Sequence, residues 1–202
     1  MIRHPAVAGQ FYSASAQKLA AEVARFTDAT ATRQPAIAVI APHAGLMYSG
    51  PVAGAVFAQV AVPPTVILIG PNHTGLGPPI SVYAEGTWLL PGGAVSIDAS
   101  LTQDILAAYS PAEADTAAHR FEHCLEVEVP FLQHARPDVR LVPIVLGTTS
   151  QQICRELGAC LARVVQAHTH GAEQPLLVAS TDMNHYESDQ VTRQKDHLAI
   201  QA

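Results

Sequence analysis

Residues 36–50 read AIAVIAPHAGLMYSG, and this stretch decides the fold class. It opens with a short apolar run over residues 36–41 that is rich in Ile and Val and too short for a helix, which predicts a strand buried on both faces. Pro42 and Gly45 then turn the chain. Ser49 is placed to cap a helix that runs to about residue 60, with Pro51 in its first turn. A buried strand that leads directly into a helix is typical of an α/β protein.

The same alternation of strands and helices continues along the chain. Further strands are predicted at residues 65–70, 80–83, 139–147 and 175–181. Further helices are predicted at residues 15–27, with Ser15 as N-cap, and at 98–109, 123–135, 150–167 and 187–201. Residues 90–98 are expected to form a loop, and Pro130 is expected to kink or shorten its helix. The sequence therefore predicts one α/β domain over residues 1–202, with a largely parallel central sheet flanked by helices.

Composition and charge exclude several classes of protein. Hydrophobic residues make up 49% of the chain and charged residues 14%, which predicts a large core and little disorder. The net charge is −6 and the 11 Lys and Arg residues are scattered, so no nucleic-acid partner is expected. No apolar run approaches the ~20 residues that cross a bilayer, and no signal peptide is evident. The three cysteines lack disulfide-framework or zinc-ribbon spacing, which favours a cytoplasmic location.

Three of the predicted strands are each followed within a few residues by a histidine: His43, His73 and His185. In open α/β sheets, ligands bind beyond the carboxyl ends of the strands. Imidazole suits iron, zinc and copper, and a site with open coordination positions is catalytic in style. Asp182 lies three residues before His185 and could orient an imidazole or bind a metal through its own oxygen. We therefore expect these four side chains to converge on one pocket at this edge of the sheet.

Simpler interpretations remain open at this point, because a single histidine in a loop is usually solvated or hydrogen-bonded. The segment EHCLEVEVP, residues 122–130, could place His123 and Glu126 on one helical face as a wall of the pocket. An exposed helical face fits that spacing at least as well. The segment HTHG, residues 168–171, looks like a metal pair, but a helix end with Gly171 as C′ explains it better.

Five segments resemble, in order along the chain, the motifs of the Memo family. They are PAVAGQFY, APHAGLMYSG, GPNHTG, EHCLEVEVPFLQ and STDMNHY, at residues 5–12, 41–50, 70–75, 122–133 and 180–186. The resemblance covers nearly all of residues 4–202. Bacterial and archaeal members of this family are often called system protein B of the AmmeMemoRadiSam group. The resemblance implies a fold similar to that of class III extradiol dioxygenases, which are non-haem iron enzymes that open catechol rings.

The resemblance also implies roles for particular residues. His43 and His73 match family metal ligands, and Asp182 and His185 match residues of the same pocket. A histidine in the position of His185 acts as acid/base in the dioxygenases. The implied cofactor is iron, with copper or zinc as alternatives.

In one respect the sequence departs from the family pattern. The family's third metal ligand is a cysteine well beyond the motif that contains His185. This sequence has no cysteine after Cys160 and ends 17 residues after His185. The expectation is therefore a chain shortened at its C-terminus, with a histidine pair that lacks its third ligand and holds metal weakly or not at all. If the third ligand lies within the chain, Asp182, His185 and His123 are the candidates.

The residues and the resemblance together favour a metal-dependent redox enzyme of the dioxygenase type, acting on an unidentified small molecule. A non-catalytic binding or adaptor protein, with a vestigial metal site and protein partners, is the second interpretation. A metal-assisted hydrolase, in which His185 acts as general base on a bound water, is the third. Fold analogy alone does not choose among them.

Overall fold

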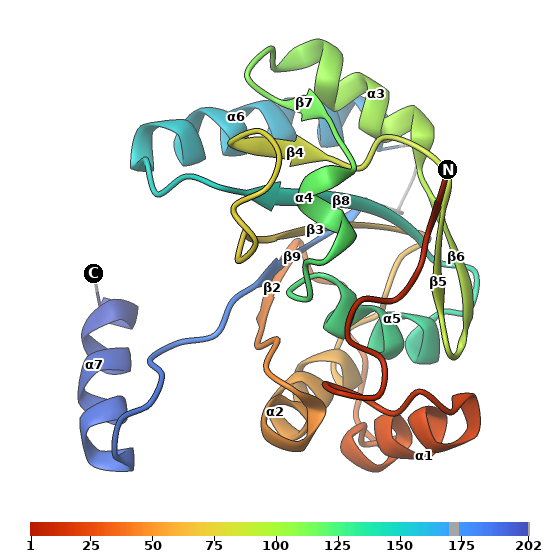
Figure 1. Ribbon diagram of the computed structural model, residues 1–202, viewed down its shortest axis with the longest axis vertical. Coiled ribbons are helices and arrows are strands. Elements are labelled where there is room, and N and C mark those ends of the chain that lie inside the picture. Colours follow the sequence, from red (N-terminus) through yellow and green to blue (C-terminus); the bar gives the residue numbers. More distant parts are fainter. Residues whose placement is uncertain (170–173, 202) are drawn as a thin grey trace.

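The computed structural model describes residues 1–169 and 174–201, and it shows one α/β domain in which helices cover both faces of a central sheet (Figure 1). The strands are β1 (Ile2–Arg3), β2 (Ala38–Ala41), β3 (Thr65–Pro71), β4 (Ile80–Val82), β5 (Thr87–Leu90), β6 (Gly93–Ile97), β7 (Glu113–Ala114), β8 (Arg140–Leu146) and β9 (Leu176–Ser180). The helices are α1 (Ala16–Phe26), α2 (Leu46–Ala58), α3 (Ala99–Ala108), α4 (Ala117–Arg120), the 3-10 helix η1 (Glu126–Glu128), α5 (Val129–Ala135), α6 (Gln151–His168) and α7 (Asp189–Gln201).

The centre of the sheet is parallel, as the sequence predicts. Within the described residues, the strand order is β1-β5-β6-β8-β3-β9-β2, with β4 beside β8 and β7 beside β4. Strand β3 pairs in parallel with both β8 and β9, and β2 pairs in parallel with β9. Antiparallel pairs join β5 to β6 and β4 to β8, so the sheet is mixed. Because β2, β3 and β9 run the same way, their carboxyl ends lie at one edge.

Two hydrophobic clusters lie between the sheet and its helices, one on each face of the sheet. Leu68 and Val178 belong to the cluster that includes residues of α1, α2 and α5. Ile67 and Val142 belong to the cluster shared with α3 and α6, on the opposite face (Figure 1). Alternate residues of β3 thus enter different cores, which explains why its sequence is a continuous apolar run.

The β5–β6 hairpin corrects the prediction of a loop over residues 90–98. Leu90 pairs with Gly93, so only Pro91 and Gly92 connect the two strands. Gly93 has a backbone φ of +132°, which residues other than glycine rarely adopt. The Pro-Gly-Gly sequence suggested a longer loop, whereas it forms a tight turn between short strands.

Two helix predictions were wrong in their details. Helix α2 begins at Leu46, and Ser49 donates its hydroxyl to the carbonyl of Ala44 at 2.6 Å instead of capping the helix. The helix predicted over residues 123–135 is divided into η1 and α5. Pro130 lies in the first turn of α5, where its missing N–H costs no hydrogen bond.

The β2 side of the domain is more exposed than the rest. Strand β2 is the sheet edge, and Ile40 in it is 67% exposed. Helix α7 has no buried residue and stands apart from the sheet layers (Figure 1). Helix α6 ends at His168, while Gly171, the predicted C′ residue, lies outside the described residues. Among the described helices, none has the length and apolar character needed to cross a membrane.

Candidate metal centre

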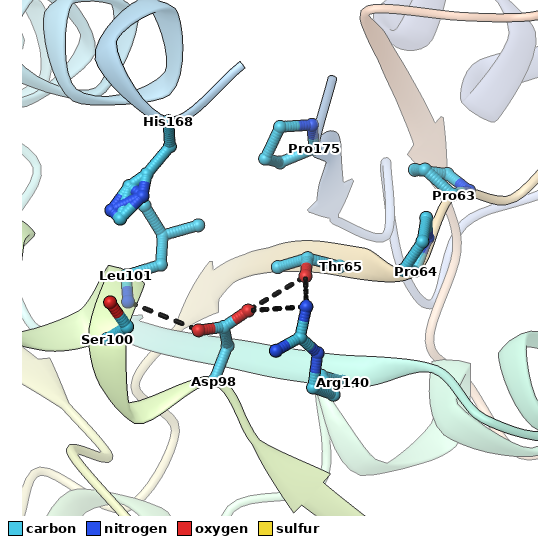
Figure 2. Close-up of a pocket in the computed structure, with 9 residues that line it drawn as sticks. All are labelled: Pro63, Pro64, Thr65, Asp98, Ser100, Leu101, Arg140, His168 and Pro175. Atoms are coloured by element: carbon cyan, nitrogen blue, oxygen red, sulfur yellow. Dashed lines mark hydrogen bonds and ion pairs between the residues drawn. The ribbon is translucent and has the colours of Figure 1, made fainter. Parts of the chain in front are cut away.

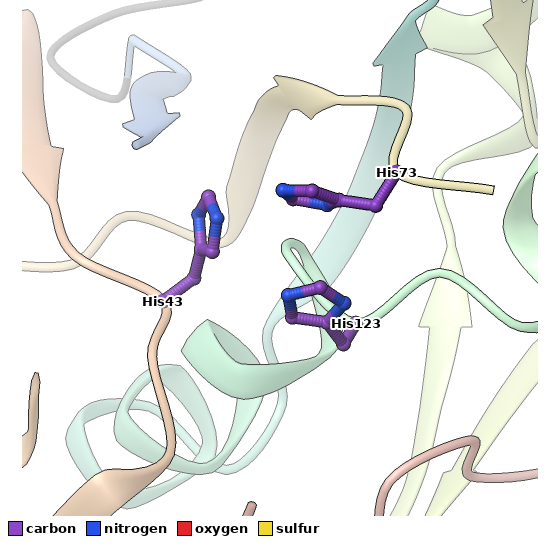
Figure 3. A group of neighbouring side chains, drawn as sticks. All are labelled: His43, His73 and His123. Atoms are coloured by element: carbon purple, nitrogen blue, oxygen red, sulfur yellow. The ribbon is translucent and has the colours of Figure 1, made fainter. Parts of the chain in front are cut away.

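Three histidines from separate segments meet at the carboxyl edge of the sheet (Figure 3). His43 follows β2, His73 follows β3, and His123 lies in the turn between α4 and η1. The ring centroids of His73 and His123 are 4.4 Å apart, and that of His43 lies 5.3 Å from His73 and 5.5 Å from His123. One ring nitrogen from each residue lies within 4.8 Å of the other two. The sequence suggested His123 as a wall of the pocket and as one of three candidates for a third ligand, and the structure brings it beside His43 and His73.

Gly70 explains how the turn that carries His123 comes so close to strand β3. A Cβ atom at Gly70 would lie 2.7 Å from Cys124 Sγ and 2.8 Å from a methyl group of Leu125. Both distances are shorter than real contacts allow, so this position requires glycine. The Cys124 thiol then donates to the carbonyl of Pro71 at 3.0 Å, which holds the turn against the end of the strand.

A buried carboxylate, Glu122, orients His73, and the sequence reasoning missed it. Its Oε1 lies 2.8 Å from His73 Nδ1 and accepts the backbone N–H groups of His123 and Cys124, at 2.9 and 3.0 Å. Its Oε2 accepts the backbone N–H of His73 at 2.6 Å. Burial alone would raise the pKa of Glu122, but these hydrogen bonds outweigh it and lower the pKa. An ionised carboxylate only accepts, so His73 carries its proton on Nδ1 and Nε2 is free for a metal.

His43 is buried beside the other two histidines, Ser180 and the Asp182 carboxylate. Its side chain is 3% exposed, and its Nδ1 lies 2.9 Å from Ser180 Oγ. The pKa of His43 is lowered to about 4 in all. Burial is the largest cause, His123 and His73 also lower it, and the Asp182 and Glu122 carboxylates oppose the shift. Burial also lowers the pKa of His123. At neutral pH these imidazoles are uncharged, which is the form that binds metal.

Asp182 lies beside His43, and His185 lies beside Asp182. Asp182 Oδ1 accepts the backbone N–H groups of His43 and Ala44 at 2.7 and 3.1 Å. Its Oδ2 lies 3.9 Å from His43 Nε2 and 3.4 Å from His185 Nε2. The His185 side chain is 51% exposed. Asp182 therefore joins a buried imidazole to one that reaches solvent.

Glu126, the other predicted wall residue, binds the N-terminal segment of the chain. It is fully buried and forms an ion pair with Arg3 at 2.6 Å. It also accepts the backbone N–H groups of Ala6 and Val7 and the hydroxyl of Tyr12. Because the predicted helix is broken, Glu126 and His123 do not share a helical face. These four bonds assign Glu126 a structural position.

The donor set fits a metal ion. His43 and His73 each use Nδ1 for a protein hydrogen bond, and His123 Nδ1 lies 3.4 Å from Glu122. Nε2 is the nitrogen left on each ring, and three protein ligands with an open position are typical of a catalytic site. Two nitrogens bound to one ion lie roughly 3.3 Å apart. The ring nitrogens lie within 4.8 Å of one another, so each pair would have to approach by at most about 1.5 Å.

A polar cavity of about 360 Å³ lies at the opposite edge of the sheet from the histidines, where β3 and β8 begin (Figure 2). There Asp98 accepts the Thr65 hydroxyl at 2.8 Å and pairs with Arg140 at 3.4 Å. Asp98 also caps α3 through the N–H of Leu101. The charged groups of this cavity are paired with one another, and the cavity lies at the amino ends of the strands. It is therefore a structural feature and not the site predicted at the carboxyl ends.

The fold and the histidine cluster together define an α/β protein with a candidate metal centre at the carboxyl edge of its sheet. The family model described as "Memo-like protein" matches residues 3–202, and the chain belongs to this family. It is 39% identical over 207 residues to a MEMO1 family protein of Aquifex aeolicus, covering 100% of this chain and 74% of that protein. MEMO1 family proteins of Pyrobaculum arsenaticum and Thermotoga petrophila are 37% and 39% identical, covering 98% and 100% of this chain and 74% and 77% of those proteins.

Proposed function

We propose that this protein is a metal-dependent redox enzyme that acts on a small molecule, with iron or copper held by His43, His73 and His123. The observation that carries the proposal is the convergence of three imidazoles. Nδ1 of His43 and of His73 is hydrogen-bonded to a buried protein group, and Nδ1 of His123 lies near one, which leaves Nε2 of each ring for the metal. When bound there, iron or copper supplies one-electron chemistry and open coordination positions for O₂ and substrate. The resemblance to the Memo family, which implies a fold similar to that of class III extradiol dioxygenases, supports the same class of reaction.

The protein groups beside the triad suit proton transfer to or from a substrate. His185 reaches solvent, and histidine is the side chain that most often serves as general acid or base. Asp182 lies within 3.4 Å of its Nε2 and is itself fixed by two backbone N–H groups. In this proposal His185 holds or delivers the proton, and Asp182 fixes the orientation of the ring.

Metal titration tests the ligand set. Zinc is a suitable first probe because it is redox-silent, and iron can be titrated without oxygen. Replacing His43, His73 or His123 with Ala should each weaken binding by more than the roughly 10–100-fold typical of losing an outer hydrogen-bonding partner. His134→Ala, at an exposed histidine of α5, is the matched control and should bind as the unmodified protein does. Unchanged affinity in His123→Ala would remove His123 from the ligand set.

Oxygen uptake in the presence of catechols tests the reaction class. His185→Ala should lose turnover and retain its metal content, because His185 is not one of the three proposed ligands. Stoichiometric metal without turnover on any catechol would contradict the dioxygenase assignment. Absence of metal from the unmodified protein would instead favour a binding or adaptor role.

A further inference from the structure

Ser180 Oγ lies within hydrogen-bond distance of three groups, and their chemistry places every proton. The hydroxyl is 2.7 Å from the carbonyl oxygen of Cys124, 2.9 Å from His43 Nδ1 and 2.9 Å from Glu128 Oε1. A hydroxyl has one proton to donate and two lone pairs that accept. The carbonyl oxygen can only accept, so it takes the Ser180 proton. The other two neighbours must then donate to Ser180.

From this inventory we propose that Glu128 is a neutral carboxylic acid that donates to Ser180, and that Glu128 and Ser180 are positioning residues which hold His43 with its proton on Nδ1. This tautomer leaves His43 Nε2 free for a metal, so the purpose of the arrangement rests on the proposed function. The protonation states rest on the three distances around Ser180 Oγ, since its one proton cannot serve both acceptors, and on the unpaired Oε2 of Glu128. The network ends at the carbonyl of Cys124, so it fixes His43 and does not carry protons to it.

The surroundings of Glu128 support the neutral form. Its side chain is fully buried, and within residues 1–169 and 174–201 its Oε2 has no hydrogen-bond partner. An ionised carboxylate with one bare oxygen would be an uncompensated buried charge, whereas a carbonyl oxygen tolerates this position better. The titratable groups that face it are the Asp182 carboxylate and the Cys124 thiol, and neither favours a second negative charge. The pKa of Glu128 is raised to about 8 in all. Burial is the largest cause and the Asp182 carboxylate adds to it, while a hydrogen bond donated by Ser180, the reverse of the direction proposed here, would lower it.

Two of the three imidazoles of the proposed site, His43 and His73, are thus held differently. His73 donates to Glu122, an ionised carboxylate, while His43 donates to a hydroxyl backed by an uncharged acid. A carboxylate partner raises the basicity of a ligating imidazole more than a hydroxyl does. His73 should therefore be the stronger electron donor of the pair.

Two measurements on the metal-free protein at neutral pH test the protonation states. Infrared spectroscopy should show the C=O stretch of a protonated carboxylic acid that disappears in Glu128→Gln. Long-range proton–nitrogen NMR spectra should show His43 protonated on Nδ1, both in the unmodified protein and in Glu128→Gln, because the amide N–H of glutamine can donate to Ser180 as the acid does. Absence of the infrared band, or a proton on Nε2 of His43, would overturn the inference.

Zinc affinity separates this inference from the proposed function. Glu128→Gln should bind zinc as the unmodified protein does, whereas Ser180→Ala, which removes the acceptor for His43, should bind about 10–100-fold more weakly. A large loss in Glu128→Gln would show that the neutral acid is not what His43 requires. Failure of the unmodified protein to bind zinc would count against the proposed metal site, while the infrared and NMR results would still decide the protonation of Glu128.

Discussion

Replacing Glu126 with Gln should destabilise the protein strongly and leave metal binding unchanged. Each oxygen of Glu126 accepts two hydrogen bonds: Oε2 from Arg3 and Ala6, and Oε1 from Val7 and Tyr12. Glutamine replaces one of these oxygens with an NH₂ group. In either orientation of the amide, that NH₂ group would face two hydrogen-bond donors and could accept from neither. The better orientation keeps the oxygen toward Arg3, because the Tyr12 hydroxyl can rotate to accept.

The cost follows from what this better orientation leaves unpaired. The backbone N–H of Val7 loses its acceptor, which costs about 1–3 kcal/mol when buried. Arg3, with a side chain 3% exposed, loses the charge that compensates its own. Breaking one side of a buried ion pair costs about 3–5 kcal/mol in all. For a chain of this length, that corresponds to a decrease in Tm of about 6–20 °C, at roughly 2–4 °C per kcal/mol.

Urea denaturation gives the stability change, and zinc titration gives the affinity. Glu122→Gln is the matched control, because Glu122 is also buried and lies only four residues earlier. It should weaken zinc binding about 10–100-fold, since it removes the carboxylate that orients His73. If Glu126→Gln loses zinc affinity at unchanged stability, Glu126 belongs to the site wall, as its spacing from His123 suggested.

Two further predictions concern pH and packing. His119 is fully buried, and its pKa is lowered to about 4, mainly by burial. Below about pH 6.5 the unfolded chain therefore binds a proton at this residue that the folded chain does not bind, and the free energy of unfolding should fall by about 2–3 kcal/mol between pH 7 and pH 4.5. Urea denaturation of His119→Phe at the two pH values should show that this part of the loss has disappeared. Gly54→Ala places a Cβ atom 2.3 Å from the Phe26 carbonyl oxygen and should cost about 1–3 kcal/mol. Gly158→Ala meets no atom within 4 Å, and should stabilise α6 by about 0.4–1 kcal/mol; equal effects of the two alanines would refute the packing argument.

The sequence predicts those parts of the site whose position depends only on the strand that directly precedes them. A histidine that follows a buried parallel strand must lie at the carboxyl edge of the sheet, so the positions of His43 and His73 follow from the strands alone. His123 was harder, because its turn reaches the site only through close packing at Gly70. That contact joins segments more than 50 residues apart, and no periodic pattern records it.

The orienting groups could not be predicted for the same reason. Ser180 is simply the last residue of an apolar strand, and Glu128 reads as one polar residue in a mixed segment. Their roles depend on a hydrogen bond between β9 and η1, across 52 residues of sequence. The helix predicted over residues 123–135 also paired His123 with the wrong carboxylate, because a regular helical spacing selects Glu126 and the actual turn selects Glu122.

Within seven residues the chain carries three buried glutamates, and their surroundings give them three different states. Glu122 accepts four N–H donors of the site and is held ionised, with a lowered pKa. Glu126 is paired with Arg3 and fastens the N-terminal segment, while Glu128 faces a single hydroxyl and is proposed to be neutral. The carboxylates beside the triad are then those of Glu122 and Asp182, since the charge of Glu126 is already compensated. Two carboxylates beside the triad match the charge of one divalent cation, and a neutral Glu128 is what keeps that count at two.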